Sequence, residues 1–156
     1  MNLTDAILSL DDAPAERILA TIARHRLQPP AGTVTALTPA QADALAHEIG
    51  TAPLAARATP GELARATLLL LAADPNKQAE VQALVENPPA ESFAFEPITA
   101  TLLTTAALIA LQTYVEIEYS GQTGLRIKIK KPSMDKTLLG KIAGILKNFF
   151  SGGAAG

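Results

Sequence analysis

The sequence predicts an α+β fold that is mainly α, with an N-terminal helical bundle followed by a buried apolar helix, an antiparallel β-hairpin and a C-terminal amphipathic helix. Three observations predict this order. Helix-start signals recur through the first 87 residues, residues 98–112 contain no charged side chain, and residues 113–133 alternate charged with apolar side chains.

The domain organisation follows from the same pattern. We expect residues 1–87 to form the bundle, 88–97 a Pro-rich connector, and 98–150 the remaining elements, packed on the bundle as one domain. Residues 151–156, which are Gly and Ala after the first serine, are expected to be a disordered tail.

Composition narrows the classes of protein. Of 156 residues 48% are hydrophobic, which is enough for a core, and the net charge of −2 does not suit a nucleic-acid binder. The charge is uneven, because residues 1–112 hold six bases and twelve acids whereas 113–156 hold seven bases and three acids.

The absence of cysteine excludes disulfides and thiolate metal ligands and fits a cytoplasmic location. The N-terminus lacks the basic and long apolar segments of a secretory signal.

Four expected helix starts share a capping residue that is followed within two positions by proline: Asp12, Thr38, Thr59 and Asp74. They predict helices over about 13–26, 39–49, 60–74 and 75–86. Gln41 follows Thr38 at the spacing of a capping box.

The connector and the apolar helix come next. Prolines at 88, 89 and 97 exclude an ordinary helix, and the alternating Phe93 and Phe95 suit a short edge strand or a segment lying over the core. The helix at 98–112 has almost no polar face, so it must be surrounded, and we expect it to be central between the helical body and the hairpin. At 16 residues, the apolar run 98–113 is shorter than the roughly 20 residues of a membrane-spanning helix.

The stretch TYVEIEYSGQTGLRIKIKKPS, residues 113–133, predicts the hairpin. When the two arms are paired about Gln122, Val115, Ile117 and Tyr119 meet Ile129, Ile127 and Leu125 on one face. On the other face Glu116 meets Lys128 and Glu118 meets Arg126. Such charge pairs contribute only about 0.2–1 kcal/mol each, but they fix the register. We expect a salt-bridged outer face, because the glutamates neutralise much of any phosphate-binding patch.

After Pro132, Ser133 is expected to cap a last helix over MDKTLLGKIAGILKNFF. Its apolar residues form one stripe, with lysines beside the stripe and Gly140 and Gly144 on the outer face. Two interpretations stay open: the helix covers the apolar face of the hairpin, or it binds a membrane surface or a partner. The residues that would do so are Lys136, Leu139, Lys141, Ile142, Leu146, Lys147, Phe149 and Phe150.

No catalytic set is visible in the sequence. His25 and His47 lie in separate helices without a carboxylate or a second histidine at metal-ligand spacing, and no serine stands in a nucleophile elbow. The glycines of SGQTG suit a hairpin loop better than a phosphate-binding loop. We therefore expect no enzyme, no cofactor and no metal.

The segment from residue 87, NPPAESFAFEPITATLLTTAALIALQTYVEIEYSGQTGLRIKIKKPS and onward, resembles small effector-associated proteins of bacterial conflict or immune systems. Its apolar helix, charged hairpin ending in Lys-Lys-Pro and short terminal helix carry the resemblance. Proteins of that kind are encoded beside caspase-like or trypsin-like proteases, or are carried as modules next to them. The resemblance implies an adaptor or regulator whose partner is another polypeptide.

The function that we expect is protein–protein contact through the outer face of the hairpin. Its predicted residues are Tyr114, Glu116, Glu118, Arg126, Lys128 and Lys130. The alternative is a membrane-active effector that inserts its C-terminal helix and is therefore membrane-associated. A homo-oligomer or a subunit of a larger enzyme stays open beside the first interpretation.

Overall fold

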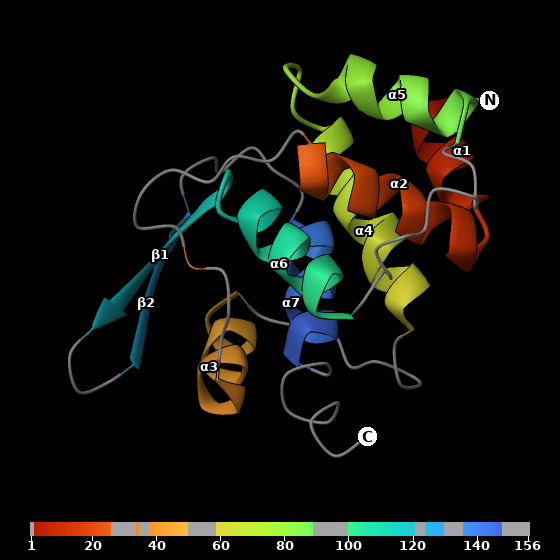
Figure 1. Ribbon diagram of the computed structural model, residues 1–156. Coiled ribbons are helices and arrows are strands. Elements are labelled where there is room, and N and C mark those ends of the chain that lie inside the picture. Colours follow the sequence, from red (N-terminus) through yellow and green to blue (C-terminus); the bar gives the residue numbers. More distant parts are fainter. Residues whose placement is uncertain are drawn as a thin grey trace.

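A computed structural model describes residues 2–25, 34, 38–49, 59–88, 100–120, 124–129 and 136–147. These ranges contain α1 (Leu3–Leu8), α2 (Asp12–His25), α3 (Pro39–Ile49), α4 (Pro60–Ala72), α5 (Gln78–Glu86), α6 (Ala100–Leu111), β1 (Val115–Ser120), β2 (Gly124–Ile129) and α7 (Lys136–Lys147). The predicted fold class, α+β and mainly α, is confirmed (Figure 1).

Two of the predicted helix starts have the expected caps. At α3 the backbone N–H of Gln41 donates to Oγ1 of Thr38 at 3.2 Å, and the backbone N–H of Thr38 donates to Oε1 of Gln41 at 3.0 Å. This reciprocal pair is a capping box. At α4 the N–H of Glu62 donates to Oγ1 of Thr59 at 3.1 Å, with Pro60 in the first turn. The prediction that the helix starting at Pro39 ends at Ile49 is also confirmed.

The other two starts differ from the prediction. α2 begins at Asp12 itself, and the Asp12 carboxylate binds Arg65 of α4. α5 begins at Gln78, three residues after the predicted start, because Asp74 forms a turn. Its Oδ1 accepts from the N–H of Asn76 at 2.9 Å, as aspartate does in turns, and its carbonyl accepts from Gln78 at 3.0 Å.

Helix α1 is absent from the sequence-based prediction. The side chain of Asn2 caps it by accepting from the N–H of Asp5 at 2.8 Å, and Ile7 lies fully in the core. The Asn-x-x-Asp spacing was the available signal, since asparagine is a favoured N-cap residue.

Helix α4 is at the centre of the packing. It lies against α1, α2, α5, α6 and α7 (Figure 1). Its buried side chains include Leu63, Leu68 and Leu70. The apolar helix α6 is surrounded as expected, with Leu103 and Leu108 in the core, but it lies beside α4 and α2 instead of occupying the centre.

Helix α6 also holds a distant backbone segment. The side-chain amide of Gln112, one residue beyond the helix, donates to the carbonyl of Val34 at 2.6 Å and accepts from its N–H at 2.9 Å. The same side chain donates a second hydrogen bond, at 2.9 Å, to the carbonyl of Leu108 in the last turn of α6. These bonds hold the backbone of Val34 against the C-terminal end of α6.

Helix α7 is a core helix. Leu139, Ile142 and Leu146 are buried, and the helix packs mainly against α3 and α4. The prediction that it covers the hairpin is corrected in part, because α3 is the helix that lies against β2. Gly140 and Gly144, predicted on the outer face, are buried too, so α7 is enclosed on more sides than its stripe indicates.

Several predictions lie outside the described residues. They concern the connector with Phe93 and Phe95, most of the hairpin loop, Lys130, the Ser133 cap, and the chain from 148 with Phe149 and Phe150. The side chains of His25, Tyr119, Leu125, Ile129 and Lys136 also lie outside the described parts, although the backbones of these residues belong to helices or strands.

Candidate functional site

The two strands of the hairpin pair in the predicted register. Val115 lies opposite Ile129, Ile117 opposite Ile127, and Tyr119 opposite Leu125. The charged positions pair in the same register, with Glu116 opposite Lys128 and Glu118 opposite Arg126. Because neighbouring side chains of a strand point to opposite faces, this register separates an apolar face from a charged face.

The two faces have different environments. Val115 and Ile117 are 0% and 6% exposed, and Ile127 is partly buried against the core. On the other face Glu118, Arg126 and Lys128 are exposed and Glu116 is half-buried. The apolar face therefore anchors the hairpin to the protein, and the charged face is open to solvent.

The cross-strand charges do not bind one another. Among the described residues, neither Glu116 and Lys128 nor Glu118 and Arg126 form a hydrogen bond or an ion pair. The four side chains instead line a hollow of about 190 Å³. The expected salt-bridged face is thus corrected. An exposed pair gains little Coulomb energy in water and loses rotamer freedom when it forms, so an open arrangement costs little.

Tyr114 does not belong to the charged face. Its side chain is 5% exposed, and its hydroxyl donates to the carbonyl of Leu70 in α4 at 3.1 Å. Burial, with a smaller effect of the nearby Asp74, raises the pKa of the Tyr114 hydroxyl above its usual value of 10.0. The structure thus corrects the prediction for this residue: Tyr114 ties the start of β1 to the central helix.

The predicted membrane or partner helix is divided between core and surface. Leu139, Ile142 and Leu146 are in the core, whereas Lys141 is exposed. The ammonium of Lys147 binds Oδ1 of Asp43 in α3 at 3.0 Å. None of the helices in the described ranges has the length and apolar character needed to cross a membrane.

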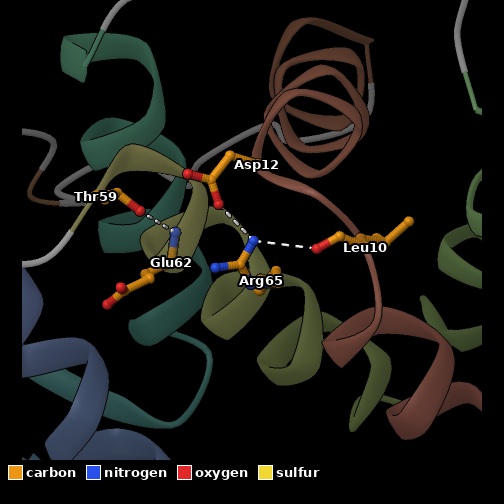
Figure 2. A network of polar contacts seen from close by, with 5 residues as sticks. All are labelled: Leu10, Asp12, Thr59, Glu62 and Arg65. Atoms are coloured by element: carbon orange, nitrogen blue, oxygen red, sulfur yellow. Dashed lines mark hydrogen bonds and ion pairs between the residues drawn. The ribbon is translucent and has the colours of Figure 1, made fainter.

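A second group of polar residues joins α2 to α4, and sequence analysis missed it (Figure 2). Nη1 of Arg65 donates to Oδ1 of Asp12 at 2.6 Å and to the carbonyl of Leu10 at 3.1 Å. A Cβ on Gly61 would collide with the Asp12 side chain, so glycine permits this close approach. The charged groups are bonded within the protein, which identifies a packing contact and not a ligand site.

The histidines are separate in the fold. His47 is exposed near the end of α3, and His25 ends α2. Within the residues that the structure describes, no three side chains of His, Asp or Glu are grouped so that they could hold a metal ion.

No family model matches the chain, and neither the curated proteins nor the solved structures searched contain a match.

Proposed function

We propose that this chain is a non-enzymatic adaptor or regulatory protein that binds another protein through the charged face of its hairpin. That face is defined here as Glu116, Glu118, Arg126 and Lys128. The single observation that carries the proposal is the arrangement of these four side chains around a hollow, without partners among the described residues.

The missing ion pairs favour binding for a physical reason. A partner that engages a surface salt bridge must first break it, whereas here the carboxylates and cations can accept new partners directly. The acids lie on one strand and the bases on the other, so a partner of complementary pattern binds in one orientation. Complementary charges of this kind contribute to specificity and association rate more than to affinity.

The non-enzymatic part of the proposal rests on the sequence, in which no nucleophile, base and orienting group stand at recognisable spacings. The nature of the partner rests on the resemblance to effector-associated proteins. It makes a protease effector of a bacterial defence system the first partner to test.

Charge reversal tests the proposal. The purified chain is used as bait in a lysate of its source organism, and captured proteins are identified by mass spectrometry. Glu116→Lys and Lys128→Glu should each reduce capture of the same protein by on the order of tenfold, because each replaces an attraction with a repulsion. Glu86→Lys and Lys141→Glu are matched controls, since they make the same charge changes at exposed positions on α5 and α7.

A double reversal separates binding from folding. Glu116→Lys with Lys128→Glu keeps opposite charges across the strands and leaves the net charge unchanged. If the single variants fail only because the hairpin is destabilised, the double variant should recover capture. We expect the double variant to remain weak in capture, because the charges that the face presents to the partner are exchanged between the two strands.

Two results would reject the proposal. One is unchanged capture by both single variants. The other is flotation of the intact protein with anionic vesicles that is lost on truncation at Ser133, since that result would assign the function to the C-terminal helix.

A further inference from the structure

Strand β1 has an edge that its neighbour does not occupy. In the described residues the sheet consists of β1 and β2 alone. In an antiparallel pair, every second residue directs its backbone N–H and C=O away from the adjacent strand. No backbone hydrogen bond joins the described residues Val115–Ser120 to a segment other than β2. The outer edge of β1 therefore offers main-chain donors and acceptors to a further strand.

The two edges of the hairpin differ in their surroundings. α3 lies against β2, whereas no helix in the described ranges makes comparable contact with β1 (Figure 1). Among the described elements, β1 is thus the side of the sheet that is less covered, and an added segment would bind there.

The charges of β1 define what can bind there. Glu116 and Glu118 lie on the charged face, and the alternate residues Val115 and Ile117 lie on the buried face. β2 already shows the matching pattern on one side of β1, with Arg126 and Lys128 opposite the glutamates. A strand on the other side places its own alternate side chains beside the same carboxylates.

The same charges disfavour pairing of β1 with a second copy of itself. Two copies of β1 side by side would place glutamates near glutamates, and like charges across a sheet are destabilising. Basic side chains on an added strand would instead be attracted to Glu116 and Glu118 from the side opposite β2.

We propose that the free edge of β1 binds an extended segment of the partner protein by strand addition. The segment is about as long as β1, which has six residues, and alternates Lys or Arg with apolar residues. Main-chain hydrogen bonds hold it, and the glutamates select its basic side chains. This inference rests on the proposed function and names the chemistry of the partner.

The peptide GLRIKIKK, a copy of residues 124–131, has this pattern and serves as the probe. It is added to the ¹⁵N-labelled full chain, and amide hydrogen exchange is followed by NMR. Alternate amides of β1 should become protected, while the protection of β2 amides should not change. GLEIEIEK, in which the three alternating bases at the positions of Arg126, Lys128 and Lys130 are replaced by glutamate, should not bind.

Two further arms separate main-chain binding from simple charge attraction. A GLRIKIKK peptide is also N-methylated at the alternate residues whose backbone N–H groups would face β1. It keeps its charges but loses the donors that strand addition needs, so its binding should be lost. Glu118→Lys in the protein should weaken binding of the unmodified peptide on the order of tenfold, and Glu86→Lys should leave it unchanged.

Equal binding of the methylated peptide, unchanged exchange of the β1 amides, or absence of peptide binding would each overturn strand addition. In all three cases the proposed function still stands if Glu116→Lys and Lys128→Glu reduce capture of the partner. A dimeric chain whose β1 amides are protected before peptide is added would also overturn the proposal, because the occupant would then be a second copy.

Discussion

The C-terminal helix and the hairpin have similar sequence patterns, since each places charged residues beside an apolar stripe, yet the structure uses them differently. In α7 the apolar side chains are buried, and Lys147 binds Asp43 of α3 at 3.0 Å. In the hairpin Val115 and Ile117 of the apolar face are buried too, but the charges on the opposite face have no partners among the described residues. An amphipathic pattern therefore indicates which side of each element faces the core, but it does not indicate which of the charges on the other side are paired.

The largest effect tests whether α7 belongs to the core. Ile142→Ala removes a side chain that is 0% exposed and should lower the free energy of unfolding by about 2–5 kcal/mol. Its exposed neighbour provides the control, since Lys141→Ala should change that free energy by less than about 0.5 kcal/mol. Urea unfolding measures both. Equal and small effects would mean that α7 is not packed, and the membrane-active alternative would gain support.

A second prediction tests the close contact between α2 and α4 (Figure 2). Gly61→Ala introduces a Cβ where the Asp12 side chain lies, so unfolding free energy should fall by about 1–3 kcal/mol. In an Asp12→Gly background the same substitution should cost clearly less, because the colliding atoms are absent. Additive effects of the two substitutions in thermal unfolding would show that the helices do not approach this closely.

Local patterns made part of this structure predictable from the sequence. The hairpin register follows from alternation, because a slip of one residue would bury charges and expose apolar side chains. The caps at Thr38 and Thr59 follow from residues within three positions of each other. The residues of the candidate charged face could be predicted because they follow from the same alternation along the two strands.

Long-range contacts made the rest unpredictable. Arg65 and Asp12 are 53 positions apart, Gln112 and Val34 are 78 apart, and no local period joins such pairs. The same holds for the absence of ion pairs on the charged face, which depends on side-chain conformations and not on residue spacing.

Tyr114 lies between the helical part and the hairpin. A third prediction tests whether its side chain stabilises the fold or binds the partner. Tyr114→Phe removes the hydroxyl that donates to Leu70 and should destabilise the protein by about 0.5–1.5 kcal/mol. Capture of the partner should not change, because the side chain is buried. Stability and capture are measured on the same preparation. Weaker capture at unchanged stability would return Tyr114 to the interaction surface.

The smallest predicted effect concerns Glu16, a charge in the helical part that its surroundings disfavour. Burial, and next the carboxylate of Asp12, raise the pKa of Glu16 above its usual value of 4.5, although Arg17 and Arg65 act in the opposite direction. The folded protein therefore binds more protons than the unfolded chain just above pH 4.5. The resulting stabilisation is fully present below that pH and is lost as the pH rises through the raised pKa of the folded state.

Glu16→Gln should remove this dependence on pH. The difference in melting temperature between variant and parent should shift in favour of the variant as the pH rises from 4.5 to 7. The exposed Glu86→Gln is the control, for which we expect no such trend. A difference that shifts in favour of the parent would mean that the cations beside Glu16 outweigh burial. Glu16 would then be a charge that the helical part stabilises, which would sharpen the contrast with the unpaired charges of the hairpin.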